Sequence, residues 1–160
     1  MDYRALLKEL KELQSKIQLD TDPISSGLNF NAQLAELQAV KERVSQILLE
    51  AIWHRQMKEV VYKKQKHKYE TAYNKLITSE DIKELKSSDL RTAKARALLE
   101  QEREQLLHAE LDFDIATTFY KTVQHVYDLL KSKNDNIINQ IKVVQTLTGI
   151  DPSIKLKISK

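Results

Sequence analysis

The segment from His54 to Lys75 combines basic and aromatic side chains in a pattern that is typical of nucleic-acid binding. It holds seven lysine and arginine residues against two glutamates, with Tyr62, Tyr69 and Tyr73 interleaved among them. Lysine ammonium groups contact phosphates, and tyrosine rings can stack on unpaired bases. The pattern predicts a site that follows the backbone of a single strand without reading its sequence.

The candidate nucleic-acid-binding residues come from this segment and from the region that follows it. They are Lys58, Lys63, Lys64, Lys66, Lys68, Tyr69, Lys75, Arg91 and Lys94. Successive residues of a helix are turned by about 100°, so the lysines between positions 63 and 68 cannot all flank one helix seam. We therefore expect some of them to face water.

A purely structural role is the alternative for the same residues. Tyr62, Tyr69 and Tyr73 keep helical spacing, which also fits core or interface positions. Residues 99–114 hold six acidic residues against one arginine, and a reversal near positions 83 and 84 would place them opposite the basic segment. Complementary charges of this kind select partner and register in coiled coils. The basic segment could therefore specify a helical hairpin without any external ligand.

Other kinds of chemistry have little support in the sequence. A Gly-rich phosphate loop is absent, because the only glycines are Gly27 and Gly149. Glu104, His108 and Asp112 share a helix face, but the Glu-x-x-His tetrapeptide of helical di-metal sites does not occur. The chain also has no cysteine for thiolate or disulfide chemistry. We expect no catalytic residue, no metal site and no cofactor.

Long amphipathic helices must position the candidate residues. The glycines and prolines all lie near the two ends of the chain, so residues 28–148 can be helical almost throughout. The predicted fold class is all-α: a long antiparallel helical hairpin or coiled coil with a short N-terminal helix and a short C-terminal strand-like tail, assembling as an oligomer. The reversal is expected within residues 78–89, where serine and aspartate side chains can cap new helices.

Four regions follow from this pattern. Residues 1–19 form an N-terminal amphipathic helix, and residues 20–28 form a linker rich in turn-forming side chains. Residues 29–149 form the long hairpin, and residues 150–160 form an extended basic tail in which apolar and basic residues alternate. A single strand cannot satisfy its own backbone, so we expect the tail to pair between subunits. Pairing with the linker, or ordering on a partner, are the alternatives.

Apolar side chains along the last long helix and the tail predict an oligomerisation surface. Both long helices also carry apolar residues off their main stripe, such as Met57 and Ile138, which implies a second packing surface and a homo-oligomer. The predicted oligomerisation residues are Leu111, Ile115, Phe119, Val123, Val126, Leu130, Ile137, Ile141, Ile154, Leu156 and Ile158.

The overall charge and the N-terminal pattern limit the cellular setting. The net charge of +3 is too small to indicate nucleic-acid binding by itself. Charged residues interrupt the first apolar stripe, so the N-terminus is predicted to be neither a signal peptide nor a membrane span. We expect a cytoplasmic protein, in the host cytoplasm if the source is viral, with no membrane partner.

The segment Lys58-Glu-Val-Val-Tyr-Lys-Lys-Gln-Lys-His-Lys-Tyr69 resembles the basic helix of the UvsY recombination mediators of T-even-type bacteriophages. That family is similar in size and mostly helical, and it ends in a helix used for assembly, here residues 107–149. The resemblance covers roughly residues 50–148. It implies binding of single-stranded DNA and loading of a recombinase onto DNA coated by single-strand-binding protein.

Individual positions support this resemblance to different degrees. Lys58, Val60, Lys63 and Tyr69 fall where the family's basic helix has lysine, valine, lysine and tyrosine, and the resemblance implies that Lys58 and Lys63 contact phosphates. The family's Lys-Ala-Arg core reads Lys-Lys-Gln from position 63 here, so its arginine is missing. The linker and the tail have no counterpart.

Two functional hypotheses result from the sequence. The leading hypothesis is a non-enzymatic recombination mediator that binds single-stranded DNA and helps load a recombinase, with itself, single-stranded DNA and a recombinase as partners. The alternative is a structural or adaptor coiled-coil protein, such as a virion component or assembly factor, with no nucleic-acid role.

Overall fold

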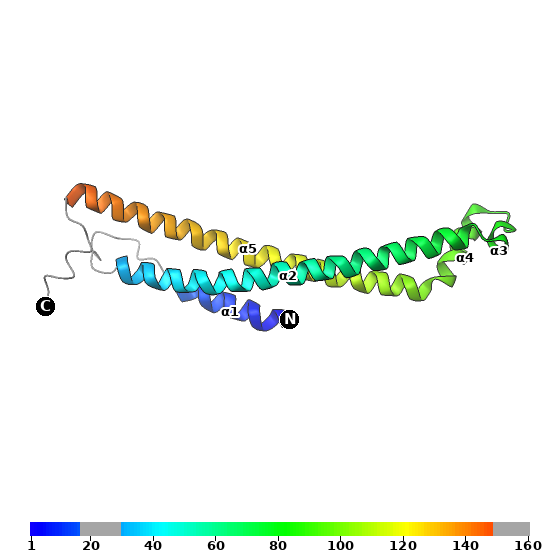
Figure 1. Cartoon of the computed structure of the whole chain (residues 1–160), viewed down its shortest axis with the longest axis horizontal. Helices are drawn as coiled ribbons and strands as arrows, with labels where there is room; N and C mark the ends of the chain where they lie inside the picture. The colour runs from blue at the N-terminus through cyan, green and yellow to red at the C-terminus, as the bar shows by residue number, and fades with distance from the viewer. Residues whose placement is uncertain (17–29, 149–160) are drawn as a thin grey trace. The chain divides into compact units, whose positions relative to one another are not determined.

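The computed structural model describes residues 1–16 and 30–148 (Figure 1). In chain order its helices are α1 (Tyr3–Lys16), α2 (Phe30–Ile77), α3 (Glu80–Lys83), α4 (Ser88–Leu98) and α5 (Glu100–Thr148). No strand occurs within the described ranges, and the expected all-α class is confirmed there. The predicted linker and strand-like tail, with Ile154, Leu156 and Ile158, lie outside the described residues.

The chain forms two compact units. The first unit consists of Met1–Glu50 and Lys121–Lys160, and the second unit is Ala51–Tyr120. Helices α2 and α5 therefore each contribute residues to both units. A single continuous hairpin over residues 29–149, and its assembly into an oligomer, stay predictions.

In the first unit, α1 packs against the initial part of α2 (Figure 1). The apolar spacing of α1 gives the helix one buried side, on which Leu10 is only 2% exposed. Next to it, the Arg43 guanidinium of α2 donates two hydrogen bonds to the Glu9 carboxylate, from Nε at 2.6 Å and from Nη2 at 3.0 Å. This bidentate contact holds the pKa of Glu9 below its usual value, because it favours the ionised form.

Aliphatic side chains spaced three and four residues apart form the core of the first unit. The buried residues are Leu10, Leu37, Val40, Val44, Ile47, Leu48, Val123, Val126, Leu130 and Ile137. Because they come from α1, α2 and α5, the core of this unit joins three helices.

In the second unit, the chain passes from α2 to α5 through α3 and α4. Helix α3 and the N-cap of α4 at Ser87 fall within residues 78–89, where the reversal was expected, and α4 continues beyond that region. Ile82 of α3 is fully buried at this point. Arg91 Nε of α4 donates a 2.6 Å hydrogen bond to the Leu85 carbonyl oxygen. The Ser87 hydroxyl caps α4 by accepting a hydrogen bond from the Asp89 backbone N–H at 3.3 Å.

Two details of the reversal differ from the sequence prediction. Ser79 occupies the N-cap position of α3, but its hydroxyl donates to the Leu76 carbonyl oxygen at 2.6 Å instead of capping the new helix. The second long helix of the predicted hairpin is interrupted at Leu99, where φ is −110° and ψ is 25°. The Leu99 side chain is buried at this break, and such a tertiary contact cannot be seen in residue spacing.

Candidate nucleic-acid interface

In the second unit, α2 and α5 run antiparallel, with the basic segment of α2 opposite the acidic segment of α5. Lys58 Nζ lies 2.6 Å from Asp112 Oδ2, and Lys68 Nζ lies 3.5 Å from Gln105 Oε1. Lys68 comes after Lys58 along α2, whereas its partner Gln105 comes before Asp112 along α5, so the two helices run in opposite directions. The predicted pairing of basic with acidic side chains is present at Lys58 and Asp112.

The two lysines that the family resemblance points to both have carboxylate partners. Besides the contact of Lys58 with Asp112, Lys63 Nζ lies 2.7 Å from Glu59 Oε1, one turn earlier on α2. The hydrogen bond and the charge of Lys63 lower the pKa of Glu59. Burial, assisted by the Lys58 charge, lowers the pKa of His54. A phosphate would have to displace a carboxylate to bind either lysine directly.

Five other predicted lysines are exposed and form no salt bridge with any described residue. They are Lys64, Lys66, Lys68, Lys75 and Lys94. Lys64, Lys68 and Lys75 share one side of α2, because steps of four and seven residues return to the same helix face. Arg91, in contrast, is held in the reversal by its bond to the Leu85 carbonyl oxygen. The basic surface that remains open therefore consists of lysines.

The tyrosines of the basic segment are half-buried and contact other rings. Tyr62 stacks on Phe113 of α5, with ring centroids 5.8 Å apart and planes inclined by 3°. Tyr69 stacks on Tyr73, one turn further along α2, at 6.2 Å and 24°. The contact with Phe113 favours the structural interpretation of Tyr62, which the spacing left open beside base stacking.

Arg55 packs between α2 and α5, a role that was not predicted from the sequence. Its guanidinium carbon lies 5.8 Å from the Phe113 ring centroid and 5.5 Å from the Tyr120 ring centroid. Its Nη2 is 4.0 Å from the Glu59 carboxylate, and its Nε is buried without a hydrogen-bond partner among the described residues. Attraction between the cation and the two rings stabilises this position. The signal in the sequence is that Arg55 lies seven residues before Tyr62, in the same heptad position.

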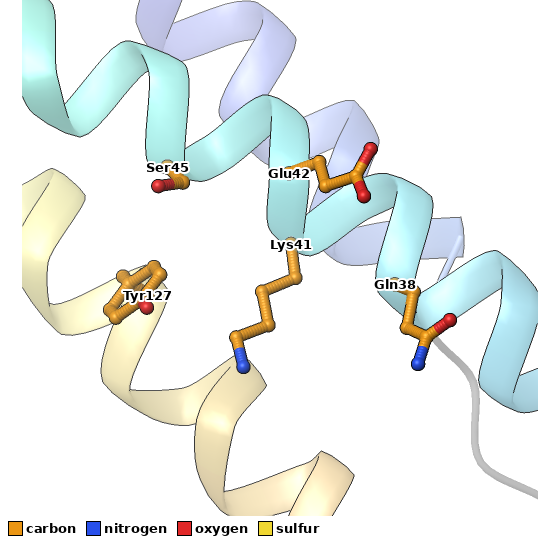
Figure 2. Close-up of a pocket in the computed structure, with 5 residues that line it drawn as sticks. All are labelled: Gln38, Lys41, Glu42, Ser45 and Tyr127. Atoms are coloured by element: carbon orange, nitrogen blue, oxygen red, sulfur yellow. The ribbon is translucent and has the colours of Figure 1, made fainter.

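An open hollow of 410 Å³ lies in the first unit, lined by Gln38, Lys41, Glu42, Ser45 and Tyr127 (Figure 2). Lys41 extends from α2 toward α5, and its Nζ lies 6.0 Å from the Tyr127 ring centroid. Figure 2 shows Glu42 pointing away from this pair. A cation–π contact thus links the two helices at the hollow.

The predicted oligomerisation residues differ in how much surface they expose. Those buried by packing within the chain itself are Phe119, Val123, Val126, Leu130 and Ile137. Leu111 and Ile115 are 56% and 44% exposed, and Ile141 is half-buried. Packing within the chain thus covers the first group, and Leu111 and Ile115 keep the most exposed surface among the described positions of this set.

Residues 1–16 and 30–148 contain neither a cluster of metal ligands nor a helix that could span a membrane. In these ranges, no group of three or more histidine, aspartate or glutamate side chains is placed to hold a metal ion, and this includes Glu104, His108 and Asp112. Every helix of the same ranges is too polar or too short to span a bilayer.

No family model, no curated protein and no solved structure matches the chain.

Proposed function

We propose that this chain is a non-enzymatic, homo-oligomeric protein that binds single-stranded DNA through its second unit and helps a recombinase assemble on that strand. The observation that carries DNA binding is the exposed lysine face of α2, formed by Lys64, Lys68 and Lys75. None of the three has a carboxylate within salt-bridge distance in the described part of the chain. Lys66 and Lys94 add two further exposed ammonium groups.

The spacing of these lysines suits a flexible chain of phosphates. Lys64 and Lys68 are one turn apart, or about 6 Å along the helix axis, and Lys75 follows after about 10 Å. Each ammonium group sits on a flexible four-carbon stem that can adjust to the position of a phosphate. Contacts of this kind carry no base information, so binding is expected to tolerate any sequence and to weaken steeply with salt.

Because the tyrosines are half-buried, the proposed affinity for DNA rests mainly on the phosphate contacts. Tyr62 is engaged with Phe113, and Tyr69 with Tyr73, so these rings have less free surface for stacking on bases. A strand held by its phosphates keeps its base edges available for pairing. This property fits a protein that prepares a strand for a recombinase, and the recombinase itself is suggested by the resemblance of residues 58–69 to the UvsY mediators.

A salt-dependent binding titration tests the proposal. A fluorescent oligonucleotide is titrated with the full chain at about 50 mM and about 200 mM salt, and the slope of log K against log salt is measured. A variant with Lys64, Lys66, Lys68, Lys75 and Lys94 all changed to Ala should bind weakly. Its slope should be flatter by about 0.7 for each phosphate that is no longer neutralised by a lysine.

A matched control exists in the first unit. Its variant changes five other exposed lysines to Ala: Lys11, Lys16, Lys121, Lys131 and Lys142. Both variants lose the same charge, so only a localised binding surface makes them differ. Equal weakening of the two variants, or absence of wild-type binding at low salt, contradicts the proposal.

A structural or adaptor role, for example as a virion component or assembly factor, is the second candidate. The ion pairs of Lys58 with Asp112 and of Lys63 with Glu59 favour it, because they use basic side chains to stabilise the helices themselves. This candidate predicts self-association without any binding to single strands at low salt, so the same titration separates the two functions.

A further inference from the structure

Helix α2 of the second unit has an exposed apolar stripe on the side that faces away from α5. The stripe consists of Trp53, Met57 and Val60, and Trp53 is 63% exposed. Trp53 lies two residues before Arg55, which packs on α5, and two residues correspond to a turn of about 200° around the helix. Packing the Trp53 indole and the Met57 side chain against another helix would remove a large apolar area from solvent. This side of α2 is suited to a further helix.

Helix α5 of the second unit has a corresponding stripe. Leu107, Leu111 and Ile115 are spaced by four residues and are all exposed. Phe113, two residues from both Leu111 and Ile115, packs on Tyr62 of α2, so the stripe lies on the opposite side of α5. Within this unit, α2 and α5 thus each have one side that packs within the chain and one apolar side that is open.

Charged side chains of opposite sign extend the two stripes. On α2, Lys64 follows Val60 along the same side of the helix, and Lys68, whose Nζ lies 3.5 Å from Gln105 Oε1 of α5, borders this side. On α5, Glu100 and Glu104 precede Leu107 along its open side. All four charged residues are exposed, and none forms a salt bridge with another residue of the described ranges. The open sides are therefore apolar and basic on α2, and apolar and acidic on α5.

Only one pairing of these sides satisfies both the apolar and the charged positions. When α2 of one copy lies antiparallel to α5 of another, the apolar residues face each other at successive levels: Trp53 with Ile115, Met57 with Leu111, and Val60 with Leu107. The same register sets Lys64 against Glu104 and Lys68 against Glu100. Two α2 stripes packed in parallel would instead bring lysine against lysine, and two α5 stripes would bring glutamate against glutamate.

We propose that the open side of α2 in one copy packs antiparallel on the open side of α5 in a second copy of this chain. Such a contact joins two different surfaces, so each added copy leaves one surface of each kind free at the ends. The assembly grows in one direction until it closes into a ring or remains an open row. Trp53, Met57 and Leu111 provide the apolar centre of the contact, and the lysine–glutamate pairs fix its direction and register.

Cysteine crosslinking tests the contact directly, because the natural chain has no cysteine. Full-length chains that carry Met57→Cys or Leu111→Cys are incubated separately and as a mixture with oxidised glutathione. The mixture should give a disulfide-linked heterodimer, and each variant alone should stay uncrosslinked. A Met57→Cys homodimer, or a mixture without heterodimer, overturns the proposal. A mixture of Met57→Cys with Glu110→Cys, which lies off the stripe, is the matched control and should give little product.

Charge reversal provides a second test, read by light scattering on the assembled state. The pair K64E and K68E, or the pair E100K and E104K, should each prevent association by placing like charges opposite each other. An equal mixture of the two variants, or one chain with all four changes, should associate again. If neither the mixture nor the four-fold variant associates, although circular dichroism shows that their helicity is preserved, the proposed contact is contradicted.

These tests are done without DNA, so they are independent of the proposed DNA binding. Lys64 and Lys68 serve in both proposals: in the assembly they pair with Glu104 and Glu100 of a neighbouring copy, and a phosphate has to displace those carboxylates to bind them, whereas Lys66, Lys75 and Lys94 stay open. A chain that crosslinks as expected but fails to bind oligonucleotides would keep the assembly contact and remove only the DNA-binding function.

Discussion

Lys58 of α2 and Asp112 of α5 form an ion pair of 2.6 Å that joins the basic and acidic segments within the second unit. The side chain of Lys58 is 32% exposed and that of Asp112 is 53% exposed, so water screens the pair in part. The pair is a contact between helices, and it makes Lys58 less available to phosphate than its position in the basic segment suggests.

Removing the Asp112 charge should therefore release a lysine for DNA. Asp112→Asn is expected to raise oligonucleotide affinity and to steepen the salt slope by about 0.7, the value of one added phosphate contact. The control is Asp114→Asn, because Asp114 is exposed and has no salt-bridge partner within the described residues. The measurement is the two-salt titration of both variants. Equal effects of the two would show that only net charge had changed.

Acid should weaken the docking of α1 through Glu9. The bond from Arg43 lowers the pKa of Glu9, so its contribution to stability is present above the carboxyl's ordinary pKa and is lost as pH falls through the lowered value. Glu9→Gln should cost about 0.2–1 kcal/mol at pH 7, since the pair is partly exposed. Urea unfolding of the wild type and the variant at neutral pH and at about pH 3 gives the difference in their free energy of unfolding at each pH. A difference between variant and wild type that is the same at both pH values contradicts this account.

The stacking of Tyr62 on Phe113 predicts that the stability of the fold depends on the Tyr62 ring and not on its hydroxyl. Tyr62→Ala should lower the free energy of unfolding by about 2 kcal/mol, because it removes a half-buried ring and leaves Phe113 without its stacking partner. Tyr62→Phe keeps the ring and should change stability by less than about 0.5 kcal/mol. Thermal and denaturant unfolding give both numbers. A Tyr62→Ala variant as stable as wild type would mean that the ring does not pack between the helices.

The reversal of the second unit should depend on Ile82. This side chain is fully buried in α3, and Ile82→Ala should cost about 2–5 kcal/mol, the usual range for a large aliphatic residue in a core. Leu90→Ala is the matched control, because Leu90 is 58% exposed and should change stability by less than about 0.5 kcal/mol. Denaturant unfolding of the two variants compares them. Similar stabilities would contradict the described packing of α3.

Residue spacing was sufficient to predict the helical class and the place of the reversal. Apolar side chains at steps of three and four residues mark α1, α2 and α5, and Ser87 with Asp89 marks the start of α4. The charge pattern and the expected position of the reversal also predicted that the basic and acidic segments lie opposite each other. The contact between Lys58 and Asp112 agrees with this prediction.

Features that depend on register could not be predicted in this way. Whether a lysine meets a carboxylate of the other helix changes when one helix shifts by a single turn, so residue spacing could not single out Lys58 as the partner of Asp112. The pair of Lys63 with Glu59, four residues apart on α2, does not depend on that register and could have been predicted from spacing. The break at Leu99 follows no glycine, proline or cap residue and accompanies the burial of its side chain. In the sequence Arg55 entered only the charge count of the basic segment, whereas its two ring contacts place it between the helices.

The central claim, that exposed lysines of the second unit bind the phosphates of a single strand, can be measured residue by residue. Lysines of the full chain are acetylated with and without a saturating oligonucleotide, and the modified positions are quantified by mass spectrometry. We predict that DNA protects Lys64, Lys66, Lys68, Lys75 and Lys94 and leaves Lys11, Lys121 and Lys131 of the first unit unchanged. Protection spread evenly over both groups, or no protection of the first group, would contradict the claim.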